Sequence, residues 1–397
     1  MAHSAEYLSE KAGVYQLYEN IPASVIDHYA DGIILSILWN LDAMKPLESV
    51  MRASYSFEDG KWPAESLLSD IEDGGTASRQ YIRYWHGSVA ITAIMLLALD
   101  IRGIYVFHGL ALIVLTVCLI CQLIKKRFLI ALCGITLALI SAGIWLVPLS
   151  LEYTWNFLLM LVLSLVVILA KASFIKKRQV LLFFFAGIVT NYLDFLTTES
   201  ITLTIPLLLL LYRQRMEGEI GKKELALRSF LSCLFWGIGY AGMWATKWLL
   251  AALALGENVL PYISGHIDER LGTAGGQAGL DLAMAAIWEN FRSLFPMGWQ
   301  PWGWTLFWIA AFLLSYLIYV YRRKRADWSF IAVCSVLGLL PYVRYALLQN
   351  HSYTHFFFTY RAQTAGVLAL SLILSELVDW EAFLRGFRRK SGIGGRE

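Results

Sequence analysis

Long apolar segments separated by short basic clusters fill the chain from about residue 104 to residue 379. About 20 apolar residues in a helix cover the hydrocarbon core of a bilayer, so such segments are typical of membrane-spanning helices. The pattern predicts an all-α, polytopic transmembrane helix bundle with nine spans. Their expected ranges are 104–124, 128–148, 155–172, 179–193, 199–212, 229–250, 303–320, 327–347 and 361–379.

The basic clusters give the expected orientation of these spans, because cytoplasmic loops of membrane proteins carry an excess of Lys and Arg. Nine crossings that start outside place all five clusters, and a basic tail at 380–397, in the cytoplasm. The clusters are Lys125–Arg127, Lys176–Arg178, Arg213 to Lys223, Arg322–Arg325 and Arg385 to Lys390. The same orientation places outside the cell the regions 1–103, 149–154, 194–198, 251–302 and 348–360.

Residues 87–100 are apolar but too short for a tenth span. As a helix they extend about 21 Å, less than the roughly 30 Å of the hydrocarbon core. A tenth crossing would also move every basic cluster outside. We therefore expect 87–100 to lie on the outer membrane surface as an interfacial helix. The segment 199–212 is equally short, and only the charge alternation favours it as a span.

The region before the first span, residues 1–103, is polar and acidic. Between residues 1 and 85 there are 13 Asp or Glu and six Lys or Arg. We interpret this region as an extracytoplasmic helical loop. Its export needs a carrier, and the simplest hypothesis is one more apolar helix before Met1 in the natural protein.

Composition agrees with a membrane protein and excludes several soluble classes. Apolar residues make up 58% of the chain and charged residues 16%, with a mean hydropathy of +0.56. Soluble domains carry about 25% charged residues. A soluble enzyme, a nucleic-acid binder and a disordered scaffold are therefore excluded, and the lipid bilayer is the expected surroundings. The five cysteines lie inside apolar runs, which predicts no disulfide framework.

Five cations lie at the expected outer ends of the helices, against the general charge pattern. They are Arg83, Arg102, Lys247, Arg344 and Arg361. Each alone is consistent with a side chain that reaches lipid headgroups. Five at one level, in loops that are otherwise acidic, favour binding of an anionic ligand such as a phosphate or diphosphate.

Two pairs of carboxylates are candidates for acid–base chemistry. Asp27 and Asp31 are four residues apart, so on a helix both face one way; the alternative is an ordinary solvated helix start. Asp194 and Glu199 occupy a short outer link between two spans. Desolvation there favours a role in substrate binding, and the alternative is that they cap the following helix.

Histidines accompany these charges near the outer ends of the spans. His351 and His355 have the i, i+4 spacing of a helical metal pair, but a zinc site needs at least one more ligand. Hydrogen bonding to a substrate, or an interfacial aromatic belt that includes Tyr360, is the favoured interpretation. No metal ligand set is assigned.

The motif at 83–87, with sequence RYWHG, combines a cation, two aromatic rings and a histidine at the membrane surface. Trp85 and His86 suit stacking on a sugar ring, and the same composition suits the anchoring of an interfacial helix. Both interpretations stay open at this stage. A P-loop, a dinucleotide-binding glycine motif and a nucleophile elbow are absent from the sequence, so chemistry driven directly by a cytosolic nucleotide is not expected.

Together these features resemble the GT-C superfamily of polytopic membrane glycosyltransferases. The resemblance rests on the large acidic first outer loop, the RYWHG motif before an interfacial helix, the arginine at the start of the next span and the many short-looped helices. More narrowly, the motifs IDHYADG, RYWHG, NYLDFLT and NHSYTHFFFTYR look like those of GT-C-like membrane proteins from Gram-positive bacteria. The first transmembrane helix of the superfamily pattern has no counterpart in this chain.

The resemblance implies transfer of a sugar from a polyprenyl-phosphate donor to a glycan or lipid acceptor of the cell envelope, on the extracytoplasmic face. Asp27 or Asp31 matches the first-loop acid, which in the superfamily is a catalytic base or a metal ligand, so a divalent metal is an open alternative. Arg83 to His86 match the segment before the interfacial helix, and Arg102 matches the arginine of the next span. The rival hypotheses are a transporter or flippase of lipid-linked sugars and a non-catalytic membrane protein.

Overall fold

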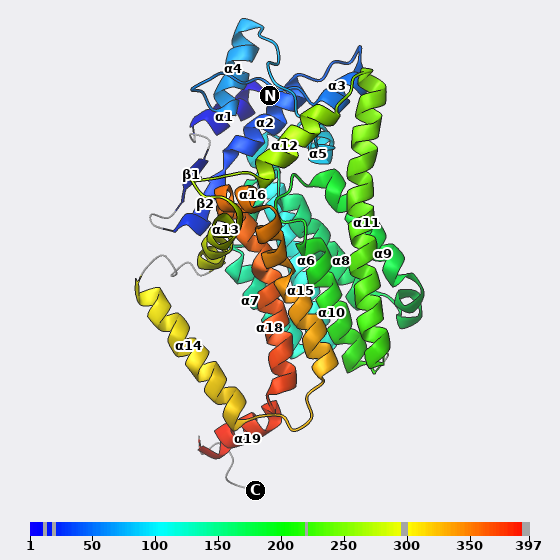
Figure 1. Ribbon diagram of the computed structural model, residues 1–397, viewed down its shortest axis with the longest axis vertical. Coiled ribbons are helices and arrows are strands. Elements are labelled where there is room, and N and C mark those ends of the chain that lie inside the picture. The colour runs from blue at the N-terminus through cyan, green and yellow to red at the C-terminus, as the bar shows by residue number, and fades with distance from the viewer. Residues whose placement is uncertain (11–13, 18–20, 219–220, 295–300, 391–397) are drawn as a thin grey trace.

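The computed structural model describes residues 1–10, 14–17, 21–218, 221–294 and 301–390, which are mostly helical (Figure 1). The last part of the predicted basic tail, 391–397, lies outside the described residues. The strands β1 (Val14–Gln16) and β2 (Val25–Asp27) pair in antiparallel register. This small ribbon leads directly into the helix that begins at His28.

Each of the nine predicted spans contains a helix in the part of the chain that the structure describes. The helices are α6 (Ile101–Lys125), α7 (Leu129–Ser141), α8 (Thr154–Leu169), α9 (Ala172–Leu193), α10 (Ile201–Met216), α11 (Lys222–Leu255), α14 (Pro301–Val320), α15 (Trp328–Leu347) and α18 (Thr364–Leu377). Among the described residues, five helices are long and apolar enough to cross a membrane: α6, α11, α14, α15 and the stretch Phe356–Leu377. For α7 to α10, the assignment as spans stays a prediction.

Successive helices of the bundle run in opposite directions, so the basic clusters gather at one end, at the bottom of Figure 1. Ion pairs join these clusters across the sequence. Lys126 Nζ lies 2.7 Å from Glu217, and Arg215 lies 3.0 Å from Asp327. The alternation that the charges predict is therefore present. That this end faces the cytoplasm remains the prediction of the charge rule.

Small residues let the helices of the bundle approach closely. A Cβ atom on Gly187 of α9 would lie 2.1 Å from the carbonyl oxygen of Trp236, and one on Gly239 of α11 would lie 2.2 Å from that of Phe184. The two helices thus contact each other backbone to backbone, which is how membrane helices gain close packing where the hydrophobic effect between them is weak. Helix α10 is buried along nearly its whole length at the centre of the bundle.

The predicted span 128–148 is wrong in one respect, because its helix ends early. Helix α7 stops at Ser141, and the chain turns at Gly143, which has a φ of 62°. The carbonyl oxygen of Ala142 then accepts hydrogen bonds from Arg361 Nε and Tyr360 Oη. A short 3-10 turn, η2 (Val147–Leu149), carries the chain on to the 149–154 link.

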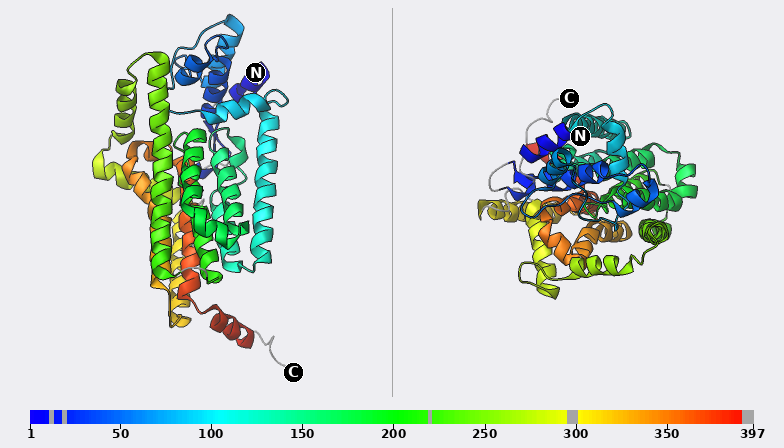
Figure 2. Two further views of the ribbon diagram at one scale, coloured as in Figure 1. Left: turned by 90° about the vertical axis from the view of Figure 1, so that its right-hand side faces the viewer. Right: turned by 90° about the horizontal axis from the view of Figure 1, so that it is seen from above.

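The N-terminal region lies at the end opposite to the basic clusters (Figure 1). Its helices are α1 (Ala2–Glu10), α2 (His28–Trp39), α3 (Pro46–Arg52), α4 (Pro63–Asp73) and α5 (Gly87–Met95), with the turn η1 (Pro22–Ser24) before β2. Helix α5 lies across the bundle axis (Figure 2) and exposes Ile94. Its place on a membrane surface stays a prediction.

Three further helices complete this end: α12 (Leu260–Leu271), α13 (Gly279–Leu294) and α16 (Gln349–Thr354). The short elements α17 (Phe356–Thr359) and η4 (Tyr360–Gln363) join α16 to α18. The last described helix, α19 (Trp380–Lys390), lies at the basic end.

Candidate functional site

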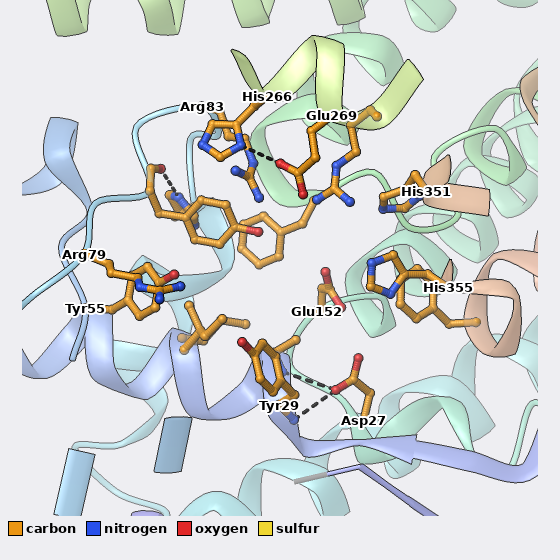
Figure 3. Close-up of a pocket in the computed structure, with 18 residues that line it drawn as sticks. Asp27, Tyr29, Tyr55, Arg79, Arg83, Glu152, His266, Glu269, His351 and His355 are labelled. Carbon is orange, nitrogen blue, oxygen red and sulfur yellow. Dashed lines mark hydrogen bonds and ion pairs between the residues drawn. The ribbon is translucent and has the colours of Figure 1, made fainter. Parts of the chain in front are cut away.

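A polar cavity of about 320 Å³ lies between the N-terminal region and the adjoining ends of the bundle helices. Its walls come from α2, the 79–86 segment, the 149–154 link, α12 and α16 (Figure 3). Five of the predicted site residues line it: Asp27, Arg83, His86, His351 and His355. The cavity therefore brings together residues that lie more than 300 positions apart in the sequence.

Asp27 lies at the start of α2 as its N-cap and has extended backbone (φ −105°). Its Oδ1 accepts hydrogen bonds from the backbone N–H groups of Tyr29 and Ala30, at 2.9 and 3.3 Å. Oδ2 has no protein donor within the described residues and lies on the side of the cavity (Figure 3). Burial raises the pKa of Asp27 to about 6, although the two backbone hydrogen bonds act to lower it.

Asp31 does not line the cavity and has no exposed surface. It accepts hydrogen bonds from Tyr105 Oη (2.5 Å) and from the backbone N–H of Leu151 (2.8 Å). Burial raises its pKa to about 8. The prediction that Asp27 and Asp31 share one helix face is wrong, because Asp27 precedes the first helical residue.

Glu152 lies between Asp27 and His355 in the cavity (Figure 3). Its Oε2 is buried and has no hydrogen-bond partner in the described part of the chain. Burial first, and the nearby charge of Asp27 second, raise the pKa of Glu152 well above its ordinary value. The hydrogen bond from Leu151 to Asp31 fixes the backbone immediately before Glu152, so Asp31 positions this second acid.

Three arginines line the same cavity: Arg79, Arg83 and Arg270. The guanidinium of Arg83 lies 4.3 Å from the centre of the Tyr81 ring, and that of Arg79 lies 3.4 Å from the centre of the Phe57 ring. Within the described ranges, no carboxylate lies at ion-pair distance from Arg83 or Arg270. Glu269 lines the same cavity. Its hydrogen bond with His266 first, and then the charges of Arg270 and Arg83, lower its pKa, although neither arginine forms a close ion pair with it.

Three histidines of the cavity, His86, His351 and His355, are neutral at ordinary pH. His86 has a positive φ of 57°, and its Nε2 lies 2.8 Å from the carbonyl oxygen of Tyr81. Burial lowers the pKa of His86 to about 3 and that of His355 to about 3. His351 shows the same direction, with burial as the first cause and the neighbouring His355 as the second. These rings therefore serve as hydrogen-bonding groups and as apolar walls.

His351 and His355 lie side by side, with their ring centres 4.8 Å apart. In the residues that the structure describes, no group of three or more His, Cys, Asp or Glu side chains is close enough together to hold a metal ion. The zinc alternative for this histidine pair thus lacks its third ligand here. His266 of α12 pairs instead with Glu269, at 2.9 Å.

Three other predicted residues lie away from the cavity. Arg102 is half exposed and contacts His3 at 3.0 Å. Trp85 donates from Nε1 to the carbonyl oxygen of Met243 (2.7 Å). Lys247 is fully buried, and its Nζ donates to the carbonyl oxygens of Val50 and Met51 at the end of α3.

Asp194, Glu199 and Arg344 take part in hydrogen-bond networks beside the cavity. Arg344 pairs with Glu199 at 2.8 Å and also lies 3.5 Å from Nδ1 of His351. Asp194 accepts from Asn156 and from the backbone of the 196–197 turn, and burial raises its pKa to about 6. These networks support the walls of the cavity.

Tyr360 and Arg361 stabilise the turn that follows the end of α7. Both side chains donate to the carbonyl oxygen of Ala142, at 3.1 and 3.0 Å. The guanidinium of Arg361 also stacks on Tyr153, 5.0 Å from its ring centre. Neither residue lines the cavity.

Sequence reasoning missed Arg79, Glu152, His266 and Arg270. A usable signal existed for the last two, because His266 and Arg270 are four residues apart in HIDER and so share one face of a helix. Glu152 is the one acid in the predicted 149–154 outer link. Its placement beside Asp27 follows from the tertiary fold alone.

Comparison of the chain with known protein families, with curated proteins and with solved structures finds no match. The family of the chain is therefore not established by similarity, and the function must be argued from the cavity.

Proposed function

We propose that the protein is a membrane glycosyltransferase of the GT-C type, which moves a sugar from a polyprenyl-phosphate donor to a cell-envelope acceptor. The observation that carries the proposal is one cavity that holds a buried carboxylate, Asp27, together with two arginines, Arg83 and Arg270, which form no close ion pair within the described residues. A glycosyl transfer of this kind needs a base for the acceptor and cations for the departing phosphate.

The expected orientation of the bundle supports this proposal. The basic clusters lie at one end of the bundle and the cavity at the other, so the charge rule puts the cavity on the extracytoplasmic side. The cavity volume, about 320 Å³, falls in the range of small-molecule sites. Aromatic rings of Tyr29, Tyr55 and Tyr81 line it, and such rings suit contact with the faces of a sugar.

The residues of the cavity have complementary roles in the proposed reaction. Oδ2 of Asp27 takes the proton of the acceptor hydroxyl, whose oxygen then bonds to the anomeric carbon of the donor sugar. The bond between that carbon and the phosphate oxygen breaks, and the electron pair leaves with the phosphate. Arg83 and Arg270 stabilise the negative charge that develops there.

The first experiment follows sugar transfer in membranes that contain the protein and radiolabelled polyprenyl-phosphate sugars. We expect Asp27→Asn to slow transfer at least about a hundredfold, because general-base catalysis contributes about 10²–10⁴-fold. Asparagine is an N-cap as good as aspartate, so the helix start is preserved. Asp100→Asn is the matched control, because Asp100 caps α6 through Gly103 and lies outside the cavity.

Equal transfer by wild type and Asp27→Asn would remove Asp27 as the base. If wild type consumes no donor but moves the lipid-linked sugar across the bilayer, the transporter hypothesis replaces this one. If wild type does neither, the non-catalytic hypothesis gains. Loss of transfer in Asp100→Asn as well would show that the assay reports folding and not chemistry.

A further inference from the structure

A second cavity of about 230 Å³ adjoins the polar one beside α12, and apart from Arg83, His266 and Arg270 its lining residues are aliphatic or aromatic. Trp244 and Trp248 of α11 form one wall, and Ile263 and Ile267 of α12 form another. Leu348, which follows α15, closes the end. No sugar or phosphate group suits such walls, because burying a polar group without a hydrogen bond is costly.

Arg83, His266 and Arg270 line both cavities. The Nε atoms of Arg83 and Arg270 are buried and have no hydrogen-bond partner in the described ranges. The two guanidinium groups therefore lie at the boundary between the polar cavity, which contains carboxylates, and the apolar cavity. A ligand that is complementary to both cavities has an anionic group in its middle, a polar part on one side and a hydrocarbon part on the other.

The apolar cavity lies next to surface that the expected orientation places in or near the membrane. Its walls on α11 belong to a helix that is long and apolar enough to span the bilayer. On the same helix Leu249 is 60% and Leu253 is 71% exposed, and on α12 Ile267 is 45% exposed. A hydrocarbon chain that leaves the cavity here meets apolar side chains and then lipid.

We propose that the apolar cavity holds the first units of the hydrocarbon chain of a lipid-linked phosphate, whose phosphate binds between Arg83 and Arg270 and whose sugar occupies the polar cavity. The inference rests on the proposed function for the identity of the sugar-bearing donor. It adds the path of the chain, which leaves between α11 and α12. It also makes the site selective for a single-chain lipid phosphate over a water-soluble phosphate.

The test measures binding to the purified full chain in detergent, with farnesyl phosphate and inorganic phosphate as probes. We expect wild type to bind farnesyl phosphate at least about tenfold more tightly, because only that probe buries hydrocarbon in the apolar cavity. Leu348→Trp and Ile267→Trp add bulk to this cavity. Both should weaken farnesyl phosphate binding about tenfold or more and leave phosphate binding unchanged.

Val106→Trp is the matched control, because it adds the same ring to an exposed position on α6, away from the cavity and from the proposed path between α11 and α12. Arg270→Gln should weaken both probes, since it removes one of the two phosphate-binding cations. Equal affinity of wild type for the two probes would overturn the proposal. So would tryptophan variants that bind farnesyl phosphate as well as Val106→Trp does, or phosphatidate that binds as tightly as farnesyl phosphate.

Binding and transfer separate this inference from the proposed function. Selective farnesyl phosphate binding that is lost in the tryptophan variants, without any sugar transfer by wild type, would keep the inference and reject the glycosyltransferase. Sugar transfer that depends on Asp27, with equal binding of the two probes, would keep the enzyme and reject the path of the lipid chain.

Discussion

The two ends of the bundle differ in how their charged side chains are paired. At the basic end, Arg215 lies 2.6 Å from Glu376 and 3.0 Å from Asp327, so the cation has two acidic partners. At the cavity end, Arg83 and Arg270 have no carboxylate at ion-pair distance among the described residues, while Glu152 has a buried oxygen without a partner.

This difference separates charges that hold the fold from charges that await a ligand. Paired charges recover part of the cost of leaving water, whereas an unpaired buried charge is only a cost to folding. Ionisable groups kept unpaired near membrane depth are by default a sign of function. Neutralising one side chain at each end therefore tests whether the two groups of charges have different roles.

The largest effect is expected at the cavity end, from Arg83→Gln. In the proposed reaction Arg83 stabilises the departing phosphate, and loss of one such group costs about 10²–10³-fold in rate. Arg83 forms no close ion pair within the described residues, so its replacement leaves no carboxylate unpaired. The midpoint of thermal unfolding should therefore change little. Sugar transfer and thermal unfolding, measured on the same preparation, check the expected loss of rate and the expected unchanged stability. A variant that transfers sugar normally would remove Arg83 from the site.

At the basic end, Glu376→Ala should act on stability and not on turnover. It leaves Arg215 without its closest partner, and breaking a buried pair costs about 3–5 kcal/mol. Since the Arg215 side chain is 26% exposed, we expect a smaller loss, roughly 2 kcal/mol, between the values for buried and surface pairs. Glu381→Ala, in a pair that is mostly exposed, is the control and should have almost no effect. Similar midpoints for the two variants would contradict the contrast between the ends.

The sequence predicted the helices and their alternation well, because hydrophobic length and charge position are local properties. The depth of the cations in the membrane stays a prediction, and the sequence did not predict which groups they contact. Lys247 lies near the expected outer boundary, yet its Nζ is satisfied by carbonyl oxygens of α3, almost 200 positions earlier in the chain. Arg361 is likewise occupied by the break after α7. Such long-range partners carry no signal in local spacing.

The two candidate bases show the same limit in more detail. Their spacing of four residues suggested a shared helix face, but the capping geometry places Asp27 before the helix and turns its Oδ2 to the cavity. Asp31, one turn later, is buried outside the cavity lining and accepts hydrogen bonds from Tyr105 and Leu151. Helix starts are the least certain part of a sequence-based prediction, and here one such start decides which acid lines the cavity.

The smallest expected effect, pH dependence of transfer, decides between these two acids. A base must be ionised, so the rate should rise about tenfold per pH unit below the pKa of the base and level off above it. Burial places that pKa at about 6 for Asp27 and about 8 for Asp31. His86 and His355, with pKa values lowered to about 3, add no step between pH 5 and 8.

Changes in folding do not imitate this rise. A carboxyl whose pKa is raised by folding binds its proton more tightly in the folded chain, so its contribution makes the fold less stable as pH increases from about 4 to the folded pKa. For both acids this loss of stability would make the transfer rate fall as the pH increases, whereas ionisation of the base makes it rise. A midpoint near 6 therefore supports Asp27, and one near 8 assigns the base to Asp31. A flat profile between pH 5 and 9 excludes both, since neither acid then changes charge in the step that limits transfer.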